Sequence, residues 1–372
     1  MIDHTPLDVA TLAPAAQKAL GPGPARMMAS RGLVPLPPVE QLTVLYQLAI
    51  DGDPNLATAA RTTAMGLPDT MLAGTLSNPA LDPRVIDLFA QLVGDNPKVF
   101  EALVSNPHVA DETIAYLAAN GGAREIDRIS NNEQRLLRHP QIIAAMYQNK
   151  LARMSTVDRT VELAVRNNIR VPGLAAWDEI AQALQAHPSP PQSAAEVDAI
   201  FGAALAVADD TELRVGDAEK ILPEQTEEPP QKKKDEETPY DKLSVPQKIR
   251  LAMVGNAVDR SKTIRDPIKM VAVATIKAGG VTEFEAAGYA SNPGLAADVI
   301  KYIAQKRDWT KAYGVKFSLC RNPKTPVSDS MRLMPFLREK DLQGIAKSKG
   351  VPSAVVQQAR KLMAQRTGPA KK

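Results

Sequence analysis

Few side chains in this sequence have both the type and the spacing that catalysis or metal binding requires. His108 and His139 lie beside turn prolines, without a second His, Cys or carboxylate at ligand spacing. The single cysteine, Cys320, follows an apolar run and has no neighbouring His to activate it as a nucleophile. The sequence therefore predicts no catalytic residue, no metal site and no cofactor, and we expect that the protein is not an enzyme.

The densest group of polar and aromatic side chains is QKRDWTKAYGVK at 305–316. Its basic residues surround two aromatic ones: Lys306, Arg307, Lys311 and Lys316 around Trp309 and Tyr313. The two aromatic residues are four positions apart, so they share one face if the segment is helical. Such a cluster suits phosphates with base stacking, or an acidic protein surface. The alternative is a core Trp309 whose neighbouring lysines extend along it to solvent.

Further basic residues occur on both sides of this cluster, in segments that resemble one another. They are Arg265, Lys269, Lys277, Arg321, Lys324, Lys340, Lys347 and Lys349. Structural repeats place equivalent positions on one surface, so these residues are predicted to form a basic stripe that docks an anionic partner.

A repeated segment is the element that must position these side chains. It reads SNPALDPRVIDLFA at 77–90, SNPHVADETIAYLA at 105–118 and SNPGLAADVIKYIA at 291–304, with looser copies that start at 138, 265, 321 and 348. Successive starts within each half of the chain are 26 to 33 residues apart. A recurrence of this length is typical of stacked supersecondary units.

Each repeat combines a turn with a short amphipathic helix. Asn and Pro favour the turn, and Asp82-Pro83 and Thr325-Pro326 each suggest an N-cap followed by Pro at the first helical position. Apolar residues then recur at helical spacing, as in Val85, Ile86 and Phe89. One such stripe is too small to be buried alone, so neighbouring repeats must stack. The predicted fold is all-α, with two α-solenoid arrays joined by a flexible linker.

The repeats resemble HEAT-type helical repeats, and the shorter Asn-Pro-rich units resemble the leucine-rich-repeat-variant class, a right-handed superhelix of short helices. The resemblance covers roughly 60–187 and 245–365. The second half, with RDPIKM, RDWTKAYGVK, NPKTP and REKDLQGIAKSKGVP, is also similar to a widespread bacterial family of uncharacterised proteins. These resemblances imply a helical-repeat fold and an interaction role, and they supply no catalytic residues.

Composition shifts along the chain predict its domain boundaries. We expect a flexible arm at 1–36, an acidic repeat domain at 37–187, a linker at 188–242 with one short helix near 194–210, a basic repeat domain at 243–365 and a basic tail at 366–372. Trp177 is expected to pack on the first array as its cap. The acidic, Pro-rich stretch 211–241 has too little apolar surface to fold alone.

Charge is divided unevenly between the two halves. Residues 1–244 hold 21 Lys/Arg and 33 Asp/Glu, whereas residues 245–372 hold 24 Lys/Arg and 9 Asp/Glu. The asymmetry predicts an anionic partner for the basic half, or attraction between the halves themselves. One cysteine, no export signal and no apolar run long enough to span a membrane predict a cytoplasmic protein without a membrane partner.

Three functions remain open from the sequence. The first is a non-catalytic scaffold or adaptor for protein partners, and the second is nucleic-acid binding through the basic half. The third is an enzyme, because Asp308-Trp309 on a basic array is similar to what helical-repeat DNA glycosylases use.

Overall fold

The computed structural model describes residues 2–186, 193–215 and 238–366, and these residues form α-helices and short 3₁₀ helices without any strand. The parts of the chain that lie outside the described residues include about half of the predicted linker and nearly all of the predicted basic tail. The chain divides into two compact units, unit 1 at Met1–Gly173 and unit 2 at Leu174–Lys372. Each unit is described by itself.

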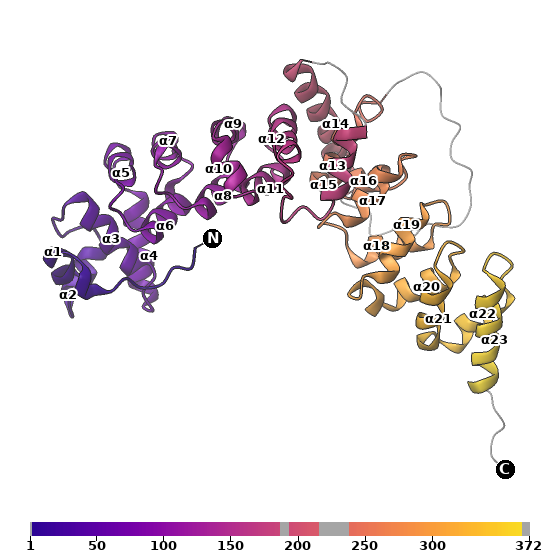
Figure 1. Cartoon of the computed structure of the whole chain (residues 1–372). Helices are drawn as coiled ribbons and strands as arrows, with labels where there is room; N and C mark the ends of the chain where they lie inside the picture. The colour runs from indigo at the N-terminus through magenta and orange to yellow at the C-terminus, as the bar shows by residue number, and fades with distance from the viewer. Residues whose placement is uncertain (1, 187–192, 216–237, 367–372) are drawn as a thin grey trace, which may run out of the picture. The chain divides into compact units, whose positions relative to one another are not determined.

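Unit 1 contains one 3₁₀ helix and the first twelve α-helices (Figure 1). They are η1 (Val9–Thr11), α1 (Pro14–Ala19), α2 (Pro24–Ser30), α3 (Pro38–Ala49), α4 (Pro54–Met65), α5 (Asp69–Leu76), α6 (Pro83–Val93), α7 (Pro97–Ser105), α8 (Asp111–Asn120), α9 (Ala123–Ser130), α10 (Glu133–Arg138), α11 (Gln141–Gln148) and α12 (Met154–Arg166).

The helices of unit 1 pack in two rows. In one row α4 contacts α6, α6 contacts α8, and α8 contacts α11, while in the other row α5 contacts α7, α7 contacts α9, and α9 contacts α12 (Figure 1). Small residues such as Ala60, Ala90 and Ala118 are buried and let neighbouring helices approach closely. Val85, Ile86 and Phe89 are fully buried, as their spacing predicts.

The described residues of unit 2 form the other eleven α-helices and two 3₁₀ helices. They are α13 (Trp177–Ala186), α14 (Ala194–Val215), α15 (Val245–Val254), α16 (Ala257–Thr263), α17 (Lys269–Lys277), α18 (Glu283–Ser291), α19 (Ala297–Gln305), η2 (Trp309–Lys311), α20 (Tyr313–Arg321), α21 (Val327–Leu333), η3 (Met334–Phe336), α22 (Glu339–Lys347) and α23 (Ser353–Arg366). Here α15 contacts α17 and α17 contacts α19, while α18 contacts α20 and α20 contacts α22.

The turn asparagine of the repeat forms hydrogen bonds in two directions. Asn106 Oδ1 accepts from the backbone N–H of His108 at 2.9 Å, which closes the turn, and its Nδ2 donates to Leu76 O at 2.8 Å in the preceding repeat. Likewise, Asn322 Oδ1 accepts from Lys324 N, and Asn322 Nδ2 donates to Ala290 O. Asn149 repeats this arrangement with Leu151 N and Ala118 O. All three side chains are buried, so these bonds join consecutive repeats within the core.

The segment for which the sequence predicted a flexible arm belongs to unit 1. Residues 2–36 contain η1, α1 and α2, and α1 and α2 pack against α3. Extended residues before them are also bound: Tyr46 Oη donates to Thr5 O at 2.9 Å, and His4 Nε2 lies 2.9 Å from Oδ2 of the buried Asp87. These contacts make the described part of the segment an edge of the helical stack.

The boundary between the two units lies after Gly173, whereas the sequence predicted a boundary near residue 187. Helix α13, expected to close the first array, packs against α15 and α17 of unit 2, and Glu179 accepts a hydrogen bond from Lys277 Nζ at 2.7 Å. The predicted short helix at 194–210 is α14, which runs to Val215 and contacts α15 and α16. Trp177, which was predicted to cap the first array, is buried and is the first residue of α13, which belongs to unit 2.

Candidate functional site

The predicted cluster at 305–316 separates into a buried part and an exposed part. Trp309 is 4% exposed, its ring meets Tyr302 edge-on at a centroid distance of 6.1 Å, and Lys306 Nζ lies 3.9 Å from its ring centroid. Trp309 is therefore a core residue covered by a lysine, and it offers no free ring face for stacking. A core Trp309 with a lysine extended along it is the alternative interpretation that the sequence allowed for this cluster.

Trp309 and Tyr313 do not share a helical face. Trp309 begins the 3₁₀ helix η2 and Tyr313 begins α20, and between them Ala312 has an extended backbone with ψ of 134°. Beside them Asp308 forms an ion pair with Lys311 at 2.8 Å, and this bond lowers the pKa of the Asp308 carboxyl. Asp308 is therefore exposed and paired, whereas Trp309 is buried.

Several of the other predicted binding cations serve contacts within unit 2. Lys277 is paired with Glu179, Lys269 is paired with Asp298, and Lys324 Nζ donates to Leu295 O of the preceding repeat at 2.6 Å. Lys277 is largely buried, so its charge is directed inward. Most of the predicted basic residues are nevertheless exposed: Arg265, Lys269, Arg307, Lys311, Arg321, Lys324, Lys340, Lys347 and Lys349.

A second group of cations packs on aromatic rings along α20 and the segment that follows α21. Arg338 lies over the ring of Tyr313 at 4.8 Å, Lys316 over Phe336 at 5.2 Å, and Arg321 over Phe317 at 5.3 Å. We name this surface the cation–aromatic face, and it consists of Tyr313, Lys316, Phe317, Arg321, Phe336 and Arg338.

The geometry of α20 and η3 produces this face. Tyr313, Phe317 and Arg321 are spaced by four residues and therefore lie along one side of α20. The next repeat supplies Phe336 at the end of η3 and Arg338 just after it. Phe336 is 65% exposed, which is high for a phenylalanine. The face thus joins two consecutive repeats.

Hydrogen bonds hold the Tyr313 side chain of the cation–aromatic face in place. Tyr313 Oη donates to Asp341 and accepts from the backbone N–H of Arg338 at 2.9 Å. Burial and the bond to Asp341 raise the pKa of the Tyr313 hydroxyl, so Tyr313 stays neutral. The phenol therefore holds the segment that carries Arg338 in place.

The arrangement can bind carboxylates or phosphates. A cation over a ring face is attracted by the ring's quadrupole, and an arginine held in this way keeps edge N–H groups for an oxyanion. The sequence analysis found three of the six residues, Tyr313, Lys316 and Arg321. It missed Phe317, which the four-residue spacing could have indicated, and Phe336 and Arg338, for which the sequence carries no local signal.

The described residues hold no group of three or more His, Cys, Asp or Glu side chains that could bind a metal ion. Burial raises the pKa of the Cys320 thiol to about 12, and this thiol is directed toward Ser330 O. Within the same residues, every helix is too short or too polar to cross a bilayer.

Comparisons with protein-family models, with curated proteins and with solved structures find no match to this chain. The resemblance of the repeats to HEAT-type units, and of the second half to a bacterial family, therefore stays a prediction.

Proposed function

We propose that this protein is a non-catalytic adaptor made of two α-solenoid arrays, and that the cation–aromatic face of unit 2 docks an acidic protein partner. The observation that carries the proposal is the set of three cation–ring pairs on α20 and the segment after α21, in which Arg321, Phe336 and Arg338 are exposed. The recurring sequence unit and the asparagine bonds between consecutive repeats support the solenoid part.

An acidic protein surface suits the face better than stacked bases. A base needs a free ring, yet Trp309 is buried and each ring of the face already has a cation over it. A carboxylate needs only oriented donors, which the two arginines supply. Nucleic acid remains the second candidate, because the exposed Phe336 has one ring face that Lys316 does not occupy.

The test measures binding to the full chain by fluorescence anisotropy. The probes are a labelled peptide of alternating Glu and Gly, single-stranded DNA and double-stranded DNA, each at about 50 and 200 mM salt. We expect the acidic peptide to bind, and the Arg321→Gln/Arg338→Gln variant to weaken it at least tenfold, since each lost charge-assisted bond costs about 1.5 kcal/mol.

A matched control separates the face from general charge. Lys301→Gln/Lys361→Gln removes the same charge from exposed positions of unit 2 outside the face. Equal weakening by both double variants, or no peptide binding at the lower salt, would contradict the proposal. Salt-steep DNA binding that Phe336→Ala reduces more than peptide binding would establish the second candidate.

A further inference from the structure

In unit 1 a segment outside any helix, residues 2–8, is held on α3 and α6 by side chains of those two helices. Gln47 on α3 binds the main chain of Leu7 twice, since its Oε1 accepts from Leu7 N at 2.9 Å and its Nε2 donates to Leu7 O at 3.5 Å. An amide side chain that makes this pair of bonds imitates the main chain of a neighbouring strand. Main-chain bonds of this kind give affinity for an extended peptide whatever its side chains are.

The same two helices also bind Thr5. Tyr46 Oη donates to Thr5 O at 2.9 Å, and Arg84 Nη1 donates to Thr5 Oγ1 at 3.0 Å. Tyr46 lies on α3 beside Gln47, Arg84 lies on α6, and the two helices contact each other. Main-chain groups at two positions of the segment are therefore bound by helix side chains, which is the contact pattern of a bound peptide.

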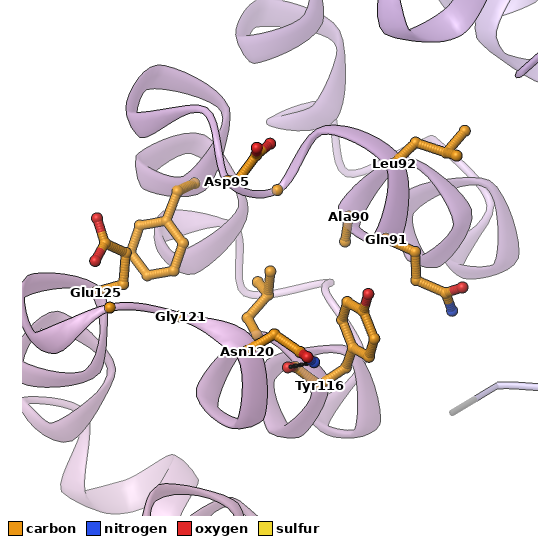
Figure 2. A pocket seen from close by; sticks show the side chains of 12 residues that line it. Ala90, Gln91, Leu92, Asp95, Tyr116, Asn120, Gly121 and Glu125 are labelled. Carbon is orange, nitrogen blue, oxygen red and sulfur yellow. Dashed lines mark hydrogen bonds between the residues drawn. The ribbon is translucent and has the colours of Figure 1, made fainter. Parts of the chain in front are cut away.

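A buried carboxylate lies next to these contacts. Asp87 on α6 is fully buried, and its Oδ2 accepts from Gln91 Nε2 at 2.9 Å and lies 2.9 Å from His4 Nε2. Gln91 in turn lines the pocket at the ends of α6 and α8 (Figure 2). Among the described residues, His4 is the one base that pairs with Asp87. Because a buried carboxylate needs donors, this position of the segment is selected for a side chain that donates a hydrogen bond.

Two side chains of the segment are recognised individually. The ring of His4 meets the ring of Tyr46 edge-on at a centroid distance of 5.9 Å, a contact that an aliphatic lysine side chain would not make. Three positions later, Leu7 is buried, whereas the intervening Thr5 and Pro6 are exposed. The helices therefore select a histidine and a leucine three positions after it.

We propose that this α3–α6 face, which consists of Tyr46, Gln47, Arg84 and Asp87, is a docking site for an extended segment of a partner protein that carries a histidine three positions before a leucine. Residues 4–7 occupy the face as an internal competitor, and a partner segment of the same chemistry displaces them. Their release opens only a surface segment outside the helices, so the helical core of unit 1 stays folded. The site lies in unit 1 and does not depend on the function proposed for unit 2.

Fluorescence anisotropy on the full chain tests the proposal. The probe is a labelled peptide with the sequence of residues 2–8, IDHTPLD, and the control peptide has Ala in place of both His and Leu. We expect the His4→Ala/Leu7→Ala variant to bind the probe at least tenfold more tightly than the parent, because its own segment competes less for the face. Adding Gln47→Ala to this variant should weaken probe binding at least tenfold, since both bonds to the peptide main chain are lost.

Two matched controls separate the face from general effects of substitution. Asp3→Ala/Val9→Ala changes exposed side chains on either side of residues 4–7 and should leave probe binding as in the parent. Gln41→Ala, added to the His4→Ala/Leu7→Ala variant, removes an amide from the same helix α3 and should leave the binding of that variant unchanged.

Three results would overturn the proposal: equal binding of the probe and the control peptide, no gain in the His4→Ala/Leu7→Ala variant, or equal effects of Gln47→Ala and Gln41→Ala. Light scattering gives a fourth. A dimer of the parent that the His4→Ala/Leu7→Ala variant loses would overturn the assignment to a partner protein, because the occupant would then be a second copy of the chain.

Discussion

At the scale of single residues, a turn asparagine can do more than form a turn. Asn106, Asn149 and Asn322 each close their own turn and donate to a carbonyl 30 to 32 residues earlier in the chain. Asn78 occupies the same place in its repeat and closes its turn with Ala80 N at 2.9 Å, but no described hydrogen bond leads from it to another repeat. Substituting Asn106, which makes both bonds, and Asn78, which makes the turn bond, therefore separates the contribution of the bond between repeats to stability.

We predict that Asn106→Ala destabilises the protein by about 2–3 kcal/mol, because it leaves the buried Leu76 O without its donor and also removes the turn bond to His108 N. Chemical denaturation of the full chain followed by circular dichroism measures this loss. Asn78→Ala removes the turn bond alone and should cost about 1 kcal/mol or less. Equal losses in the two variants would contradict a stabilising role for the bond between repeats.

The sequence could predict the turn but not this second bond. Asn at a turn with Pro after it is a local signal, whereas the identity of the carbonyl that Nδ2 reaches depends on how consecutive repeats stack.

The prediction that Thr325 is an N-cap followed by Pro326 at the first helical position was wrong for a similar reason. Thr325 Oγ1 donates to Leu319 O at 2.7 Å instead of capping a helix, and α21 begins at Val327. At Asp82-Pro83 the prediction is confirmed, because Asp82 Oδ1 accepts from Arg84 N and Pro83 is the first residue of α6.

At the scale of elements, the first turn of α8 is joined to α10 by charge. Asp111 lies at the start of α8, and it contacts Arg135 Nε at 3.3 Å and Arg138 Nη2 at 2.6 Å, both from α10. The bond to Arg138 lowers the pKa of Asp111. A carboxylate at this position also suits the positive end of the helix dipole.

This ion cluster gives a pH-dependent prediction. Since the pKa of Asp111 is lower in the folded chain than its ordinary value of about 3.9, the cluster stabilises the fold above that value, and the stabilisation is lost as pH falls below it. We expect the free energy of unfolding of Asp111→Asn to be lower at pH 7 and to fall less between about pH 5 and pH 3 than that of the parent. Denaturant titrations at several pH values between about pH 5 and pH 3 measure the free energy of unfolding of both proteins. The exposed Asp69→Asn should keep the parent's slope, and a parallel curve for Asp111→Asn would argue against the cluster.

The helix positions themselves could largely be read from the sequence, but their partners could not. Trp177, which was predicted to cap the first array, is the first residue of α13. The helix was assigned to the first array because it precedes the Pro-rich segment, whereas it packs on α15 and α17. An amphipathic stripe indicates that a helix must be covered, and it does not indicate which later helix covers it.

At the scale of the whole molecule, the negative charge of the first half is concentrated near its end. Unit 1 holds 15 Lys/Arg and 17 Asp/Glu, whereas residues 174–244 hold 6 Lys/Arg and 16 Asp/Glu. Unit 1 is therefore nearly neutral, which weakens the alternative in which it attracts the basic half as a strongly acidic domain. The acidic residues 174–244 instead belong to the same unit as the basic stretch, and Glu179 is paired with Lys277 there.

The two units should also respond separately to mutation. Each has its own buried core and its own asparagine bonds between repeats, at Asn106 and Asn149 in unit 1 and at Asn322 in unit 2. We predict two calorimetric transitions, of which Asn106→Ala lowers one and Asn322→Ala lowers the other, with additive effects in the double variant. A loss of about 2 kcal/mol should lower the affected transition by about 4–8 °C. A single transition that both substitutions lower would instead mean that the repeats unfold as one cooperative array.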